Sequence, residues 1–524
     1  MAEESDALAG VAAAPPGSAL PADSVPLAKH SYRDILKSSA MIGGSSAINV
    51  CIGIIRTKAM ALLLGPTGYG LMGAYVLISE LSRTVAQMGL NASGVRQIAD
   101  AVASNDVHRI GRTVTVLRRT SLACALLGAV LLAAFAEPIA TLTFGSGQYA
   151  DSVALLSLVV FFTVVAGSQT ALLQGMRRIA ELAKIAVLGG VLGSVFGIPM
   201  VYFLRADGLV PTLIIVAASS MAMSWWYSRQ TRIAQPSLSV AEVASESASL
   251  LKLGMAFMAS ALLMIGAAYV VRIIVLRKAG LDAAGVYYAA WTLGGLYIGF
   301  VLQAMGTDFY PRLVGVAQDN AECNRLVNEQ ARVSLLLAVP GVLLTLTLAP
   351  LAVSLFYSAQ FAPAVDVLRW ICLGMALRVL TWPIGYIVVA KNRQSLFFAI
   401  ELAWCVVNVA LTWWCVDAFG VDGAGIAFFG SYVFHGLLVY PIVRRLSGFR
   451  WTAVNVKTAS GCFAVVAAVF MGFHILPPTA AISFGILATI AGTYASVRIL
   501  VHLVSPQSLP RSIRRFLQLG RLNK

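Results

Sequence analysis

Six ionisable side chains inside long apolar stretches of the sequence are candidates for chemistry. A charge at the centre of a bilayer costs about 2.5–3.5 kcal/mol on insertion scales, so each of them needs a reason to be there. Arg binds phosphate oxygens in bidentate fashion, and Lys supplies a compact point charge. The predicted cationic binding residues are Arg56, Lys58, Arg272 and Arg378. Together they predict a site for an anionic group such as a phosphate.

Several of these charges also have a purely structural interpretation. Arg272, which precedes Arg277 and Lys278, is able to extend its charge to the membrane surface instead of binding a ligand. Glu80 and Arg83 are one helical turn apart. They form either an ion pair that cancels both charges or a pair in which Glu80 takes up a proton. The sequence leaves both interpretations open.

The composition shows what kind of chain holds these charges. Of the 524 residues, 59% are hydrophobic and only 12% are charged, against about 25% in an ordinary soluble domain. The mean hydropathy is +0.81. There is too little polar surface to cover a water-soluble globule. This composition argues against a soluble enzyme, a disordered scaffold or a nucleic-acid binder, and it predicts an all-α polytopic membrane protein.

Apolar runs long enough to cross a bilayer, roughly 20 residues each, follow one another through the chain. Fourteen helices are predicted, and twelve or thirteen remain alternatives because the breaks at 204–209 and 476–480 are short. The predicted spans are 38–63, 71–92, 114–135, 153–174, 185–204, 209–227, 252–276, 287–309, 334–355, 366–390, 397–416, 424–443, 455–476 and 480–503.

Most Lys and Arg residues fall in the loops on the same side of the membrane as the N-terminus. Cytoplasmic loops are enriched in these residues, so both termini are predicted to be cytoplasmic. This bias explains most of the net charge of +15 without nucleic acid. The basic segment 505–524 resembles an amphipathic helix that binds anionic lipids.

Features of the first half recur about 215 residues later in the second half. Gly65 and Gly70 correspond to Gly280 and Gly285, and the segment from Glu137 resembles the later one from Ala349. Six helices per repeat keep both copies in the same orientation, so two six-helix bundles forming a V around a central cavity are expected, with two further C-terminal helices. The predicted regions are a disordered tail 1–28, lobes 29–232 and 233–446, helices 447–504 and a basic tail 505–524.

The first two predicted helices also resemble a known family. A Ser- and Gly-rich first helix, the pair Arg56 and Lys58, and the Leu-Gly-Pro-x-Gly-x-Gly turn from Leu64 are similar to Wzx-type O-antigen and exopolysaccharide translocases. These belong to the polysaccharide transporter family of the MOP flippase superfamily. The segment "MGLNASGVRQIA" at 88–99 also fits.

The resemblance implies a flippase in the bacterial inner membrane that carries undecaprenyl-diphosphate-linked O-antigen or exopolysaccharide repeat units across it by alternating access. A polysaccharide polymerase and a chain-length regulator are the protein partners to expect, and a proton or sodium gradient is a candidate energy source. A small-molecule or drug exporter of the same superfamily is the first alternative, which the scarcity of buried acids disfavours. A non-transporting scaffold of polysaccharide assembly is the second.

The sequence predicts neither an enzyme nor a cofactor. It contains no G-x-x-x-x-G-K-[ST] phosphate loop, no H-E-x-x-H and no G-x-S-x-G. The seven Cys residues have no metal-ligand spacing and mostly lie in apolar runs. The longest predicted outer loop, 136–152, leaves no room for a catalytic domain outside the membrane.

Overall fold

A computed structural model describes residues 26–104, 106–231, 233, 236–304 and 309–503. These residues form α-helices and short 3₁₀ turns, and no strand occurs among them. The prediction of an all-α polytopic membrane protein is confirmed. The predicted basic tail 505–524 and most of the predicted N-terminal tail lie outside the described residues.

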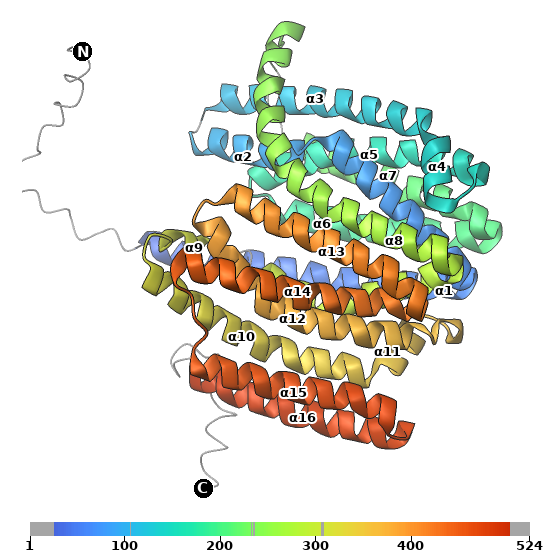
Figure 1. Cartoon of the computed structure of the whole chain (residues 1–524). Helices are drawn as coiled ribbons and strands as arrows, with labels where there is room; N and C mark the ends of the chain where they lie inside the picture. The colour runs from blue at the N-terminus through green and yellow to red at the C-terminus, as the bar shows by residue number, and fades with distance from the viewer. Residues whose placement is uncertain (1–25, 105, 232, 234–235, 305–308, 504–524) are drawn as a thin grey trace, which may run out of the picture.

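The helices and turns follow one another along the chain with short connections (Figure 1). Their bounds are α1 Pro26–Gln87, α2 Leu90–Ala103, α3 Val107–Ala134, α4 Ala136–Phe144, η1 Gly147–Tyr149, α5 Ala150–Gly175, α6 Ile179–Leu204, η2 Arg205–Gly208, α7 Leu209–Arg229, α8 Val240–Ala304, α9 Tyr310–Gly315, α10 Asn320–Thr347, α11 Ala349–Phe356, η4 Ala359–Phe361, α12 Ala364–Ala390, α13 Gln394–Phe419, α14 Asp422–Ser447, α15 Ala453–Ile475 and α16 Pro478–Leu503.

Eleven stretches of the described chain are long and apolar enough to cross a membrane. Three of them, of 40, 51 and 42 residues, are too long for one crossing. Each contains a break: Gly65 in α1, the 3₁₀ turn Arg205–Gly208, and Gly280 in α8. Dividing the three stretches at these breaks gives fourteen segments in the described part. The grouping into twelve helices plus two stays a prediction.

The helices pack in two groups joined by α1 and α8. The N-terminal group is α1 to α7, in which α3 packs on α5, α5 on α7, and α6 on α1 and α7. The C-terminal group is α8 to α14, in which α12 and α13 both pack on α14. The broadest contact between the groups is that of α1 with α8, and α15 and α16 lie against α10 on the far side (Figure 1).

The two groups repeat the same local devices. Gly65 has φ 63° and Gly280 has φ 91°, and both sit at the kink of a very long helix. A positive φ costs glycine little because it has no Cβ. The Asp106 side chain caps α3 by accepting hydrogen bonds from the backbone N–H groups of His108 and Arg109. Asp319 caps α10 in the same way. These correspondences support the internal repeat.

One predicted boundary is wrong. Helix α1 begins at Pro26, so the last residues of the predicted disordered tail 1–28 are helical; proline is well suited to a first helical turn. The predicted loop 136–152 does connect the long helices α3 and α5, but it contains the short helix α4 and the turn η1. Glu137 in the first turn of α4 favours this helix, because a carboxylate there interacts with the positive end of the helix dipole.

The start of α8 is fixed by a capping box. Ser239 donates its backbone N–H and its hydroxyl to Glu242, and the backbone N–H of Glu242 donates back to the Ser239 hydroxyl at 3.2 Å. The hydrogen bonds from the backbone and side chain of Ser239 lower the pKa of the Glu242 carboxyl. Beyond it, Arg112 of α3 pairs with Glu242 and Glu246. The first turns of α8 therefore lie against the N-terminal group.

The two groups touch at both ends of the bundle through glycine. At the end that carries α4 and α11 (the α4 end), a Cβ on Gly285 would lie 2.0 Å from the carbonyl oxygen of Pro66. At the end that carries α2 and α9 (the α2 end), a Cβ on Gly89 would lie 2.0 Å from the carbonyl oxygen of Gly254. Only glycine permits such close backbone approach.

We expect Gly285→Val to destabilise the contact at the α4 end. The added side chain collides with backbone, which cannot rotate away, and overpacking of this kind costs about 1–3 kcal/mol. Thermal unfolding in detergent should show a lower Tm than for wild type. Gly295→Val is the control, because no atom lies within 4 Å of a Cβ at that position of the same helix. Equal Tm values for the two variants would contradict the close contact.

Candidate functional site

Lys58 connects the two groups at the α4 end. Its ammonium donates to the carbonyl oxygen of Ser354 in α11 at 2.5 Å and also to that of Tyr357. Nearby, the Thr67 hydroxyl donates to the carboxylate of Asp282 across the same interface. In this structure Lys58 therefore closes the interface, since two of its three N–H donors are engaged by carbonyls.

Aromatic rings fill the space between these polar contacts. Tyr69 of α1 lies 5.2 Å from the ring of Tyr288, 5.4 Å from Tyr357 and 5.6 Å from Phe361. Arg272 stacks over Tyr288, with its guanidinium carbon 4.8 Å from the ring centre. The α4 end is thus closed by a cluster of aromatic side chains, with Lys58 and Arg272 at its edge.

Nearer the α2 end, a cavity of about 530 Å³ takes its walls from both groups. We call it the inter-group cavity. The N-terminal group contributes mainly polar residues and the C-terminal group an apolar strip of α8. The lining comprises Arg83, Thr84, Gln87, Gly89, Asn91, Ala92, Val95 and Gln174 on one side and Met258, Ala261 and Ile265 on the other. The side-chain oxygen of Asn91 is buried without a hydrogen-bond partner. The cavity therefore offers a cation and several amides to a ligand.

Glu80 and Arg83 form the ion pair that their spacing allows. The Nε and Nη2 atoms of Arg83 donate to both carboxylate oxygens of Glu80 at 2.8 and 2.9 Å. The Nη1 atom of Arg83 donates to the Gln87 amide oxygen at 2.9 Å. Arg83 lines the inter-group cavity with its charge held in place by this bidentate contact.

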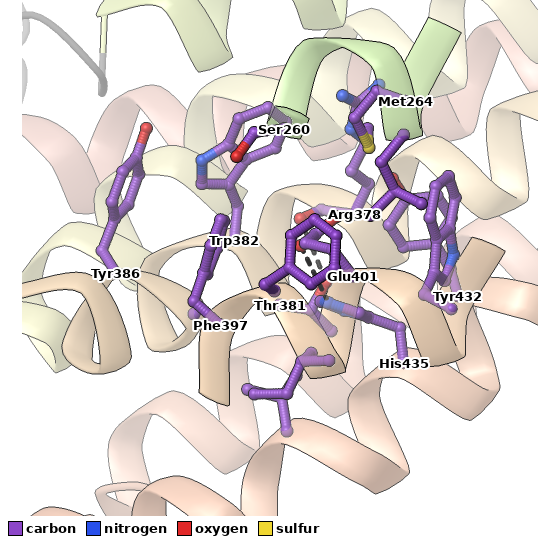
Figure 2. Close-up of a pocket in the computed structure, with 16 residues that line it drawn as sticks. Ser260, Met264, Arg378, Thr381, Trp382, Tyr386, Phe397, Glu401, Tyr432 and His435 are labelled. Carbon is purple, nitrogen blue, oxygen red and sulfur yellow. Dashed lines mark hydrogen bonds and ion pairs between the residues drawn. The ribbon is translucent and has the colours of Figure 1, made fainter. Parts of the chain in front are cut away.

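A second pocket lies inside the C-terminal group, between α8, α12, α13 and α14 (Figure 2). Its volume is about 340 Å³, and we call it the C-terminal pocket. Most of its wall is aromatic or aliphatic, with a few polar side chains. Its lining comprises Ser260, Leu263, Met264, Arg378, Thr381, Trp382, Gly385, Tyr386, Phe397, Phe398, Ile400, Glu401, Trp404, Tyr432, His435 and Val439.

Arg378 is placed in this pocket by aromatic stacking. Its guanidinium carbon lies 4.6 Å from the centre of the Trp382 ring and 5.9 Å from that of Tyr432. On the neighbouring helices, the Nε2 atom of His435 is 4.0 Å from a carboxylate oxygen of Glu401 (Figure 2). A guanidinium, a carboxylate and an imidazole thus meet in one apolar pocket.

A single stretch of α8 separates the two cavities. Met258, Ala261 and Ile265 face the inter-group cavity, while Ser260 and Met264 line the C-terminal pocket. These two sets are on opposite faces of the helix, because 3.6 residues complete one turn. A rotation or tilt of this part of α8 would change the shape of both cavities together.

The structure does not bring the four predicted cations into one cavity. Arg378 lines the C-terminal pocket, and Arg272 lines a small pocket at the α4 end with Tyr269 and Tyr288. Lys58 is bound to backbone carbonyls. Arg56 is half-buried, and its guanidinium would lie 3.7 Å from a Cβ at Gly193 of α6. Substrate contact by these residues stays a prediction.

Sequence reasoning missed the partner of His435. No carboxylate is close to His435 in sequence, yet Glu401 approaches it from the preceding helix. No local motif marks the pair. Arg369 and Asp366, in contrast, are one helical turn apart in sequence and are paired at 3.0 Å.

Comparison with known proteins decides the family. The model of a family described as "Polysaccharide biosynthesis protein" matches residues 59–366, which run from the second half of α1 through α11 to the start of α12. The chain belongs to this polysaccharide biosynthesis protein family. The match covers the inter-group cavity completely, whereas most of the C-terminal pocket lies beyond its end.

Two individual proteins that are similar to this chain agree with this assignment. The chain is 21% identical over 414 residues to the lipid III flippase of Escherichia coli (strain K12), covering 76% of this chain and 95% of that one. The lipid III flippase of Shigella flexneri matches equally well.

Solved structures show the same fold. A multidrug resistance MATE family transporter of the MOP superfamily, in its inward-facing conformation, superposes with a TM-score of 0.64 at 14% identity, covering 77% of this chain and 95% of that one. The lipid II flippase MurJ, in an inward closed conformation, gives 0.64 at 14% identity, with 88% and 100% covered. The predicted membership of a polysaccharide family is confirmed by the family match, and the fold is that of MOP-superfamily transporters.

Proposed function

We propose that this protein translocates lipid-linked oligosaccharide precursors, specifically undecaprenyl-diphosphate-linked repeat units of O-antigen or exopolysaccharide, across the inner membrane by alternating access. The observation that carries the proposal is the inter-group cavity, whose walls come from both helix groups. A ligand held there is exposed to one side or the other when the groups rock about the α1–α8 contact.

The chemistry of the inter-group cavity suits a glycosylated diphosphate. Arg83 supplies a positive charge for phosphate oxygens, and Gln87, Asn91 and Gln174 supply amides for sugar hydroxyls. The unpartnered oxygen of Asn91 is available to accept a hydrogen bond from a hydroxyl group. The lipid III flippase, to which the chain is similar, is named for the translocation of a lipid.

The remaining predicted residues fit this proposal in distinct roles. Arg56 and Arg272 would meet the diphosphate at other stages of the cycle, and Arg378 would meet the glycan part of the cargo. Lys58 would be released when the α4 end opens. Glu80 would take up a proton only if Arg83 left it for substrate, so coupling to a proton or sodium gradient would depend on that exchange. The predicted cytoplasmic termini, the anionic lipids, the polymerase and the chain-length regulator belong to the same proposal.

The test is the location of the lipid-linked glycan in a strain that lacks the gene. Inside-out vesicles would be probed for cytoplasm-facing glycan, and surface polysaccharide would be measured in parallel. Accumulation at the inner face with loss of surface polymer is expected, and the gene on a plasmid should restore both. Normal surface polymer in a strain without a second flippase would overturn the proposal, and drug susceptibility would then test small-molecule export.

Within this proposal, Arg378→Met is expected to lower export by about tenfold or more. The variant removes the cation stacked on Trp382, an interaction of about 2 kcal/mol when desolvated, and leaves Glu401 without the nearby positive charge. Surface polymer in the complemented strain is the readout, with protein amount in the membrane checked in parallel. Arg498→Met, an exposed cation on α16, is the matched control. Full export by Arg378→Met would exclude a role for this cation.

A further inference from the structure

We infer that the C-terminal pocket is a binding subsite for an uncharged sugar residue of the cargo. The inference rests on the proposed function and adds where, and by which groups, one sugar is recognised. The pocket volume of about 340 Å³ is at the low end of small-ligand sites, which span about 300–1,000 Å³. It suits a sugar ring and excludes a whole oligosaccharide.

Aromatic rings form two walls of this pocket. Trp382 and Tyr386 come from α12, and the Trp404 ring of α13 lies 5.3 Å from that of Tyr432 on α14. Such rings present broad apolar faces together with polar edges. The C–H face of a pyranose packs on such a surface, while its hydroxyl groups point to the rim. A polyprenyl chain would use the rings but not the polar groups between them.

The polar atoms of the pocket are short of partners. The Nε of Arg378, the Nε1 of Trp404 and the Nδ1 of His435 are buried without a hydrogen bond in the described structure. Buried polar groups in native proteins nearly always have a partner, and leaving one unpaired costs about 1–3 kcal/mol. Hydroxyl oxygens satisfy these groups, and the Glu401 carboxylate accepts hydrogen bonds from hydroxyl groups in return.

The charge balance distinguishes a sugar from a diphosphate. Arg378 and Glu401 are the only Arg, Lys, Asp or Glu residues in the described lining, so their charges cancel when His435 is neutral. A diphosphate would bring two or more negative charges close to Glu401 without enough cations to balance them. A neutral sugar forms hydrogen bonds with both groups and adds no charge.

The experiment compares two lipid probes that differ by one sugar. Purified full-length protein in lipid nanodiscs is titrated with a short polyprenyl diphosphate and with the same lipid carrying glucose, galactose or N-acetylglucosamine. At least one glycosylated probe should bind wild type about tenfold more tightly than the bare lipid, which corresponds to about 1.4 kcal/mol. Glu401→Gln and Trp404→Leu should reduce this ratio to about one while bare-lipid binding is unchanged.

Trp414→Leu is the matched control, because Trp414 is on the same helix as Trp404 but is 63% exposed and outside the pocket. It should keep the wild-type ratio. Equal binding of the bare and all glycosylated probes by wild type would overturn the subsite alone. An unchanged binding ratio in Glu401→Gln would also overturn it. This holds even if that variant loses transport, because loss of a proton-coupling residue would have the same effect on transport. Failure of every probe to bind would overturn the proposed function itself.

Discussion

Linking position 67 to position 282 is expected to stop translocation completely until the link is cut. Thr67 and Asp282 are hydrogen-bonded across the interface at the α4 end, so Thr67→Cys and Asp282→Cys place two thiols within reach of a short cleavable cross-linker. Alternating access requires this end to open, and a covalent link prevents that whatever the energy source. Export by the linked protein should fall by at least about a hundredfold, more than 2.7 kcal/mol of barrier.

The design needs a protein without competing thiols. Among the seven free cysteines Cys51 is exposed, so it is replaced in the test background. Each single cysteine variant, treated with the same reagent, should export normally and serves as the control. Reduction should restore export in the linked protein. Undiminished export by a fully linked protein would show that the groups do not separate at this end.

Arg83→Leu is expected to reduce export by about a hundredfold, because it removes the one cation that lines the inter-group cavity in the described structure and leaves Glu80 unpaired. The thermal stability of the variant should fall less than its export activity. The side chains of Arg83 and Glu80 are 28% and 45% exposed, and partly exposed ion pairs contribute only about 0–1 kcal/mol. Thermal stability and surface polymer are measured together.

The double variant Glu80→Leu with Arg83→Leu separates the two interpretations of this pair. If the pair only cancels charge within the helix, removing both partners should restore stability and export alike. If Arg83 binds the cargo, stability should return while export stays low, which is the expected result. Glu80→Gln alone should preserve Arg83 and retain a large part of export unless Glu80 carries the coupling proton.

The internal repeat was predictable from paired glycines and one recurring segment. Gly65 and Gly280 occur at one spacing in the sequence, and the structure gives both a positive φ at the kink of a long helix. Such residues are informative because their backbone preferences act locally, before any tertiary contact forms. The break at Arg205–Gly208 was recognisable for the same reason, since a charged and glycine-containing turn interrupts two apolar runs.

The site was less predictable, because a charge in a span identifies an unusual residue but not its neighbours. Lys58 stood out in sequence, yet its partners are carbonyls at the end of α11 and just beyond it, about 300 positions away. Glu401 and His435 were unremarkable until α13 and α14 packed together and set them 4.0 Å apart. A helix can rotate about its axis without any change in hydropathy, so the sequence does not specify which side chains meet.

The sequence by itself determined that this chain is an all-α membrane protein, where its helices break, and that Glu80 and Arg83 can pair. These are properties of hydropathy and of neighbours within one turn. Only the tertiary structure decided that Arg83 faces the inter-group cavity, that Arg378 lies in a separate aromatic pocket, and that one stretch of α8 divides the two. Helix rotation and close glycine contacts fix those positions, and both arise from packing between segments far apart in sequence.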